Sequence, residues 1–476
     1  MSSALLSVAF LLSVKEVLSD SLVLWFASLQ TTDRFLRLSV EIAIERCLGS
    51  MDAPQEVAAK VRYLQVDALA QLVAVLLRYF DEWKQNSIMS KLTLFNKVLG
   101  VIVKQMHADH GERKTSFNQK PYHRLLLRLL LDTSDVLGDQ TQLAMADALL
   151  ALQPRMVPGF AFAWLELASH KAFMPRLLQD KEKGSVLFAR ILLVLFKYLE
   201  PFLRHAELQE PIKMLYMGTL RVLLVLLHDF PELLCEYYLS LCDAIPPSCI
   251  QLRNLILSAF PKEMVLPDPF TFQERLPSME AIKPPVINSN YAAALNSANI
   301  RGDLDAFLQG RGSRTLLQDL QGQLLLRSQA EVAASGSRYN IPLINALVLY
   351  TAEFAISQGA GDKVPIERGS SMEIFVKLSR DLDNEGRYLF LTGIANQLRY
   401  PNHHTHYLSC VMLWLFKSAS DKEIVREQMT RVLIERLIVN KPHPWGLLNT
   451  FYELIRNPVC NLDLTPLILP RTPRRL

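Results

Sequence analysis

The residues best suited to bind a metal ion are three closely spaced histidines, His403, His404 and His406. Imidazole is a common ligand of transition metals, but a metal site needs side chains that converge on one point. Adjacent residues of a helix point apart, and no pair of cysteines in the chain has the spacing of zinc ligands. Because the histidines follow Tyr400 to Asn402, we expect them to form the polar first turn of a helix. We predict no metal site.

The sequence lacks the motifs of nucleophilic and phosphate chemistry. It contains no Gly-x-Ser-x-Gly elbow and no His-Glu-x-x-His motif. The run 359–361, Gly-Ala-Gly, is too short to form a phosphate-binding loop. Asp381 and Asp383 lie where a helix is expected to begin, and acidic residues there favour the helix dipole. We therefore predict that the chain is not an enzyme and binds no cofactor.

Composition narrows the class of protein further. The 476 residues include 51 Lys and Arg and 47 Asp and Glu, so the net charge of +4 argues against an extended nucleic-acid-binding face. Hydrophobic residues make up 50% of the chain, which excludes general disorder, and only 18 residues are glycine, which favours helices over turn-rich folds. Six scattered cysteines do not suggest a disulfide framework. Three of them recur every seven residues and are expected in the core: Cys235, Cys242 and Cys249.

The elements that hold these residues are predicted to be helices throughout. Apolar residues repeat with the helical period in fifteen segments: 54–81, 87–109, 119–132, 140–152, 160–178, 184–199, 208–228, 231–243, 313–327, 340–357, 370–381, 386–399, 405–418, 421–439 and 445–456. No segment has a convincing strand pattern. Helices of this length joined by short loops suggest antiparallel pairs stacked as a HEAT-like solenoid.

A proline-rich stretch divides the helices into two blocks. Six prolines fall between Pro261 and Pro285, and each fixes the backbone and removes a hydrogen-bond donor. The expected fold is thus an all-α, HEAT-like helical-hairpin solenoid in two blocks joined by an extended connection. The expected divisions are an N-terminal helical region 1–90, a first block 91–260, the connection 261–286, a second block 287–457 and a basic tail 458–476.

Two apolar segments need an interpretation of their own. The run from Ala4 to Val14 is shorter than the ~20 residues of a membrane span and lacks the basic start of a signal peptide. We expect it to be a buried helix and predict no membrane association. Leu220 to Leu227 is interrupted only by Arg221, so we expect this helix to be surrounded by others. A buried guanidinium must be paired, and we expect a carboxylate or helix-end carbonyls to bind Arg221.

Long runs of the sequence resemble the C-terminal Not domain of the large scaffold subunit of the eukaryotic Ccr–Not deadenylase complex, the family called general negative regulator of transcription, subunit one. The matching runs occur in order between about residues 90 and 457: 94–100, 121–124, 158–167, 218–235, 245–261, 266–271, 338–350, 387–407 and 430–448. Residues 1–90 match only diffusely. The family scaffold is a much longer chain, and here the sequence after Asn457 departs from the family's aromatic helical segment. We therefore expect Leu448, Phe451 and Ile455 to be left exposed.

The resemblance implies a non-catalytic helical scaffold that docks the heterodimer of the two smaller Not-box subunits. Such a domain supports mRNA deadenylation, translational repression and mRNA decay. It implies further that adaptor proteins and weak RNA contacts are possible partners, and that the protein occurs in the cytoplasm, including P-bodies, and in the nucleus. A helical-repeat RNA-binding module remains the alternative function, and it predicts an affinity for RNA that falls steeply with salt.

The polar stretches broken by proline are the expected docking surfaces, because the apolar matching runs belong in the core. The first candidate stretch contributes Leu266, Asp268 and Phe270. The second contributes Tyr400, Asn402, His404, Tyr407, His443 and Trp445. We expect these residues to bind the partner heterodimer.

Overall fold

The computed structural model describes residues 29–51, 63–79, 90–204, 207–268, 284–312, 315–359, 366–419 and 423–456. Within these ranges the ordered backbone is helical, and the one β-type contact is an isolated bridge between Leu325 and Tyr339. The predicted all-α class is confirmed. The finer HEAT-like classification stays a prediction.

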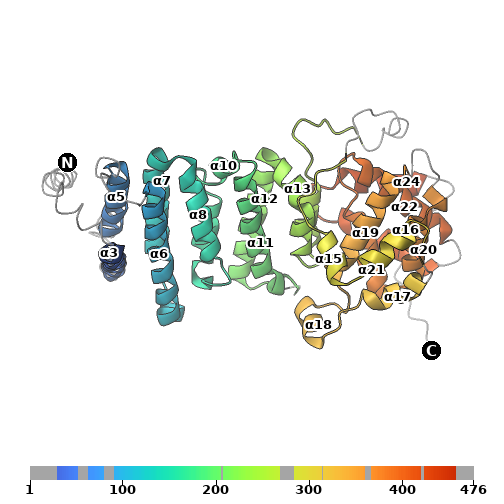
Figure 1. The fold of residues 1–476 in the computed structure, drawn as a ribbon, viewed down its shortest axis with the longest axis horizontal. Coiled ribbons are helices and arrows are strands. Elements are labelled where there is room, and N and C mark those ends of the chain that lie inside the picture. The colour runs from blue at the N-terminus through green and yellow to red at the C-terminus, as the bar shows by residue number, and fades with distance from the viewer. Residues whose placement is uncertain are drawn as a thin grey trace. The chain divides into compact units, whose positions relative to one another are not determined.

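The helices form two compact units (Figure 1). The first unit extends to Tyr198 and includes Lys213–Thr219, and the second comprises Leu199–Ile212 and the chain from Leu220 onward. Two long helices contribute to both units: α11 (Lys183–Leu203) and α12 (Glu210–Asp229).

The first unit is a stack of helices in two rows. Its other helices are α3 (Leu29–Met51), α5 (Leu64–Tyr79), α6 (Lys91–Arg113), α7 (Lys120–Leu137), α8 (Asp139–Ala151), α9 (Ala161–Ala168) and the short α10 (Met174–Leu177), with single 3₁₀ turns at Lys114–Ser116 and Pro158–Phe160. In one row α3 packs on α6 and α6 on α8, while in the other α5 packs on α7 and α7 on α9. Each helix therefore contacts the next but one in sequence, as stacked hairpins do.

Apolar stripes at helical spacing explain this packing. In α5 the buried side chains include Val66, Leu69, Val73 and Leu77, which recur every three or four residues and so share one face. The facing helix α7 begins with Pro121 in its first turn, where a missing N–H costs nothing. Burial of these two faces holds α5 against α7.

Polar contacts fix the register of the same helices. The Tyr122 hydroxyl donates a buried 2.7 Å hydrogen bond to Asp109, which joins α7 to α6. The guanidinium of Arg124 donates two hydrogen bonds, of 2.8 and 2.9 Å, to the Asp67 carboxylate and so joins α7 to α5. The bidentate geometry makes the second contact directional.

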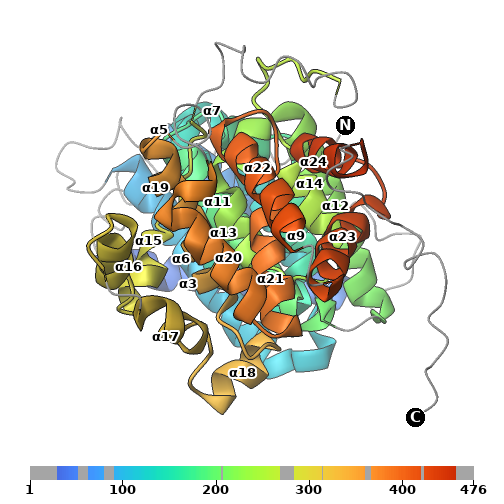
Figure 2. The same cartoon turned by 90° about the vertical axis from the view of Figure 1, so that its right-hand side faces the viewer.

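The second unit surrounds the long apolar helix α19 (Ile341–Ser357). Its other helices are α13 (Pro231–Asp243), α14 (Ile250–Leu257), α15 (Ala292–Ser297), α16 (Arg301–Leu308), α17 (Thr315–Gln323), α18 (Gln329–Ser335), α20 (Ser370–Asp381), α21 (Asn384–Ala395), α22 (His403–Ser418), α23 (Glu423–Leu437) and α24 (Trp445–Arg456), with a 3₁₀ turn at Ile366–Arg368. Helix α19 packs on α15, α20, α21 and α22, and α22 packs on α24 (Figure 2).

The boundary between the units differs from the expected boundary between the two blocks. Helices α13 and α14 precede the proline-rich connection, yet they belong to the second unit. The amide of Asn254 on α14 donates a buried 2.6 Å hydrogen bond to the carbonyl oxygen of Arg436 on α23. Helices on the two sides of a proline-rich connection can pack in one core, because such a connection interrupts the helices without separating the cores. The described ends of that connection, residues 261–268 and 284–290, are not helical.

The expectation for Arg221 is wrong. Its side chain is exposed, on the same face of α12 as the exposed Met217 and Leu224, while Val222 and Leu226 are buried. The prediction assumed that a helix with apolar residues on both faces is buried on both, whereas only one face of α12 is buried. Within the described residues α12 is also the one helix long and apolar enough to cross a membrane, a property that core helices of globular proteins share. An exposed arginine near its centre would be costly in lipid.

Several expectations concern residues outside the described ranges or at their edge. The run 4–14, Phe270 and the tail 458–476 lie outside them. At the end of α24, Ile455 is 49% exposed, whereas Leu448 and Phe451 are half-buried. The expected apolar exposure is thus confirmed for Ile455 and is only partial for the other two side chains.

Candidate docking surfaces

Most of the predicted docking residues are buried within the second unit. The side chains with exposed fractions of 7% or less are Tyr400, Asn402, His404, Tyr407 and Trp445. Leu266 and His443 are half-buried, and Asp268 is exposed. The structure thus leaves Asp268, with parts of Leu266 and His443, as the side chains of this set that a partner can reach directly.

The structure does bring the two predicted stretches together. The indole N–H of Trp445 donates a 2.7 Å hydrogen bond to the carbonyl oxygen of Pro267, next to Leu266. The amide of Gly446 donates a 2.5 Å hydrogen bond to the carbonyl oxygen of Arg399, next to Tyr400. The start of α24 therefore joins the loop before α22 to the described beginning of the proline-rich connection.

Gly446 permits this close approach. A β-carbon at this position would lie 2.4 Å from Thr405 Cγ2 and 2.7 Å from the Arg399 carbonyl oxygen. Both distances are shorter than any normal contact, and one of the atoms belongs to the backbone. The sequence therefore needs glycine at the first turn of α24 for reasons of space rather than of backbone conformation.

The polar residues of the 400–407 stretch mainly begin α22. Asn402 is the N-cap, and its side-chain oxygen accepts a 3.0 Å hydrogen bond from the amide of Thr405. Its side-chain nitrogen donates a 2.7 Å hydrogen bond to the carbonyl oxygen of Tyr400. These contacts explain why a polar, proline-containing stretch is buried, since its side chains replace the hydrogen bonds that a helix start lacks.

Arg399, in the loop before α22, forms the centre of a buried polar cluster. Its side chain is 1% exposed, and one guanidinium nitrogen donates a 3.0 Å hydrogen bond to the carbonyl oxygen of Cys235. The guanidinium carbon lies 3.6 Å from the centre of the Tyr238 ring, a cation–π contact. The Tyr238 hydroxyl in turn donates a 2.6 Å hydrogen bond to Gln397. The cluster ties α13 to the loop between α21 and α22.

His404 lies beside this cluster. Its Nε2 atom is 3.9 Å from a carboxylate oxygen of Glu353 on α19, and the hydroxyl of Tyr291 donates to the same carboxylate. Burial, with the nearby positive charge of Arg399, lowers the pKa of His404 to about 4. Burial and Arg399 lower the pKa by more than the Glu353 carboxylate could raise it, so the imidazole is neutral at physiological pH. No group of three or more metal-ligating side chains occurs among the described residues, and His403 and His406 are only half-buried.

A second buried cluster joins α13 and α14 to α19, α21 and α23. The amide of Asn345 donates a 2.7 Å hydrogen bond to Asp243, and burial raises the pKa of that carboxyl to about 6 although Asn345 and Arg253 act against the rise. Arg253 donates to the carbonyl oxygens of Cys242 and Ile245, each at 3.2 Å. Burial lowers the pKa of Arg436 to about 9, and the positive charge of Arg253 adds to this effect.

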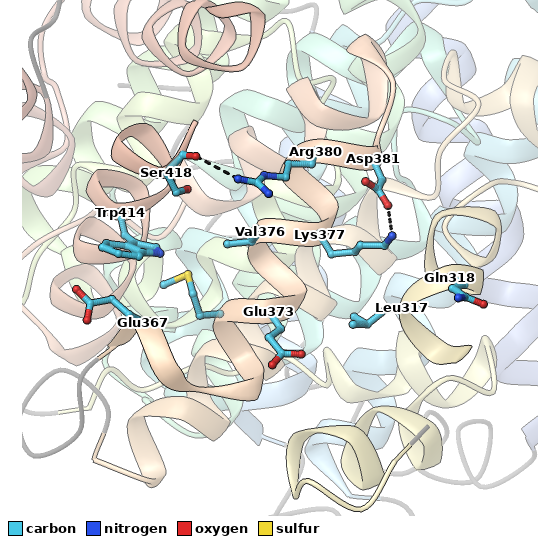
Figure 3. A pocket seen from close by; sticks show the side chains of 11 residues that line it. Leu317, Gln318, Glu367, Glu373, Val376, Lys377, Arg380, Asp381, Trp414 and Ser418 are labelled. Atoms are coloured by element: carbon cyan, nitrogen blue, oxygen red, sulfur yellow. Dashed lines mark hydrogen bonds and ion pairs between the residues drawn. The ribbon is translucent and has the colours of Figure 1, made fainter. Parts of the chain in front are cut away.

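An open groove of the second unit lies along α20. It has a volume of about 680 Å³ and runs between α22 and α17 (Figure 3). Val376 of α20 supplies apolar surface above the buried Met372, with Trp414 of α22 on one side and Leu317 of α17 on the other. Neither the buried groups His404 and Arg436 nor the half-buried Asp243 lines it. The groove combines apolar surface with charged side chains, the lining typical of a binding site.

Sequence reasoning missed this groove and the arginine cluster. Helix α20 was expected over its observed range, 370–381, but Met372 and Val376 look like ordinary members of its apolar stripe. The sequence offers no signal for the groove, since Trp414 also looks like a core residue of α22 and only the structure shows it half-buried. Nothing in the sequence around Arg399 distinguishes it from a surface arginine.

Comparison with known proteins gives consistent matches. A family model described as "CCR4-Not complex component, Not1" matches residues 130–470. The chain is 42% identical over 463 residues to the CCR4-NOT transcription complex subunit let-711 of Caenorhabditis elegans, covering 90% of this chain and 17% of that protein. It is 35% identical over 452 residues to the general negative regulator of transcription subunit 1 of Schizosaccharomyces pombe, covering 91% of this chain and 21% of that protein. The chain thus spans about a fifth of the length of these relatives.

Two solved structures share the fold. The NOT1 superfamily homology domain from Chaetomium thermophilum matches with a TM-score of 0.83 and 26% identity, over 98% of this chain and 91% of that one. A Not1 C-terminal domain in complex with Not4 matches with a TM-score of 0.77 and 25% identity, over 94% of this chain and 91% of that one.

Proposed function

Because the chain belongs to the Not1 family of CCR4-Not complex components, we propose that it is a non-catalytic scaffold domain that docks the Not-box subunit heterodimer. Through this docking it supports mRNA deadenylation, translational repression and mRNA decay, acting in the cytoplasm, including P-bodies, and in the nucleus. The observation that carries the proposal is the family match over most of the chain, together with an extensive helical surface.

The structure supports a binding role rather than a catalytic one. The side chains of His404 and Arg436, whose pKa values are strongly lowered, are buried and do not line the groove. A catalytic acid or base must reach its substrate, and these groups do not. Because a related Not1 C-terminal domain has been solved with Not4, we also propose a Not4-type protein as a second partner.

Co-purification tests the proposal. The chain is co-expressed with the two Not-box subunits of the same organism, and the mixture is separated by size exclusion with light scattering. We expect a stable species with one copy of each protein. If the chain elutes alone while circular dichroism shows that it is folded, the docking function is wrong for this chain.

A further inference from the structure

Helix α12 exposes large apolar side chains along one face. Met214, Met217, Leu224 and Val225 are each between 41% and 59% exposed. The buried side chains lie on the other face: Leu215, Thr219, Val222, Leu223 and Leu226. In the most apolar stretch of 18 residues of this helix, 28% are buried. The helix thus has two faces with apolar side chains, and the fold covers one of them.

The exposed residues of α12 repeat with a period of seven. Five exposed side chains follow one another at intervals of three and four residues: Met214, Met217, Arg221, Leu224 and His228. This spacing places side chains in one row along a helix, and such a row is the seam through which two helices pair in a coiled coil. From end to end the row is about 21 Å long at a rise of about 1.5 Å per residue. Together with Val225 these residues form the α12 stripe.

Arg221 lies at the middle of the α12 stripe. Within the described residues no hydrogen bond or ion pair engages its guanidinium. The other charged side chains of the helix lie at its ends, Glu210 and Lys213 at the start and Asp229 beside His228 at the end.

A partner that covers the apolar residues on both sides of Arg221 removes water from the guanidinium, which then needs an acceptor. A carboxylate supplies two acceptor oxygens and the opposite charge. The matching partner is therefore an amphipathic helix with a carboxylate at the middle of its apolar seam.

A second copy of the chain and a lipid bilayer match the α12 stripe less well. Arg221 lies midway between Met214 and His228, so two stripes that pair in register, parallel or antiparallel, place their Arg221 side chains against each other. Like charges in contact disfavour that pairing. A bilayer would surround the exposed guanidinium with lipid, which is unfavourable for a charged side chain. A protein helix that carries a carboxylate meets neither difficulty.

We propose that the α12 stripe docks an amphipathic helix of the Not-box heterodimer, with a carboxylate of that helix bound to Arg221. The inference rests on the proposed function and assigns it a surface on this chain. Unlike most of the docking residues predicted from sequence, the side chains of this surface are exposed. The apolar seam supplies affinity, and the ion pair fixes the register of the partner helix, as a polar residue does in the seam of a coiled coil.

Isothermal titration of the purified heterodimer into variants of the full chain tests the proposal. Arg221→Glu should weaken binding by about tenfold or more, because two carboxylates would then face each other. Leu224→Asp should weaken it similarly, because it places a charge in the apolar seam. The matched controls make the same changes at exposed positions of α11, Arg190→Glu and Val186→Asp, and should leave the affinity unchanged. All four side chains are exposed, so circular dichroism should show that every variant is folded.

The partner side of the ion pair has a test of its own. Acidic residues in the helices of the heterodimer are replaced by lysine one at a time, and each variant is titrated into Arg221→Glu. One replacement should restore the binding that Arg221→Glu loses, because it restores opposite charges across the interface. If none does, the proposed carboxylate is wrong.

Failure of this inference is distinct from failure of the proposed function. If the wild-type chain does not bind the heterodimer, the docking function is wrong and the inference falls with it. If the wild type binds and Arg221→Glu and Leu224→Asp bind equally well, or the controls lose as much affinity, the docking function stands and the α12 stripe is the wrong surface. Light scattering that shows a dimer of the chain dissociated by Leu224→Asp also overturns the inference, since the stripe would then bind a second copy.

Discussion

His404 should make the stability of the second unit depend on pH. Its pKa is about 4 in the folded protein, where the ring is buried beside Arg399, against an ordinary value of 6.5. Between pH 6.5 and pH 4, His404 is therefore protonated in the unfolded chain and neutral in the folded chain. The free energy of unfolding falls as the pH is lowered from 6.5 to 4, and at pH 5 this one residue lowers it by about 2 kcal/mol relative to pH 7.

The comparison of wild type with His404→Gln isolates this effect. Urea unfolding is followed by tryptophan fluorescence between pH 4.5 and 7, and the difference between the two proteins is plotted against pH. We expect the variant to gain about 2 kcal/mol on the wild type between pH 7 and pH 5, because glutamine has no proton to bind. The control is His228→Gln, because the side chain of His228 is 87% exposed. A difference that stays constant with pH, or an equal gain in the control, would refute the burial argument.

Three further changes test other parts of the structure. Gly446→Ala places a β-carbon 2.4 Å from Thr405 Cγ2, so we expect a loss of about 1–3 kcal/mol in urea unfolding, and an unchanged midpoint would contradict the close approach. Asn254→Ala removes the buried hydrogen bond to the Arg436 carbonyl oxygen and should lower the free energy of unfolding by about 1–3 kcal/mol. The measurement is faster amide hydrogen exchange in α14 and α23, and unchanged exchange would contradict the role of this bond. Asp243 should make the free energy of unfolding change with pH in the opposite direction to His404. Its pKa is raised to about 6 in the folded protein, so the wild type loses stability as the pH rises from 3.8 to 6. In Asp243→Asn this pH dependence should be absent from urea unfolding, and a slope equal to that of the wild type would contradict the raised pKa.

Most of the long amphipathic helices were predictable, although no expected segment covers α3 (Leu29–Met51). Helix α20 was expected over its observed range and α24 likewise, because a strong apolar period reports a face that must be buried. The single helix expected over 160–178 is instead α9 and α10, since the chain turns at residues 169–173. The short helices α14, α15, α16 and α18 were missed, because six to eight residues contain too few turns to show a period.

Tertiary arrangement was less predictable than helix location. The polar stretch around Asn402 and Trp445 was interpreted as surface, because polar and proline-rich segments usually are. Its side chains are instead buried at a junction between a helix start and two loops, where they satisfy backbone groups. The burial of Arg399 depends on Cys235 and Tyr238, which are more than 150 positions away, and local sequence does not carry that information.

The docking of the Not-box heterodimer is tested most directly by isothermal titration of the purified heterodimer into the full chain. We predict saturable binding with one heterodimer per chain, and no loss of affinity when competing RNA is present. An RNA-binding module would instead bind RNA with an affinity that falls steeply as salt rises, because each phosphate contact releases counterions. Absence of heat with a folded chain, or binding only through RNA, would contradict the scaffold function.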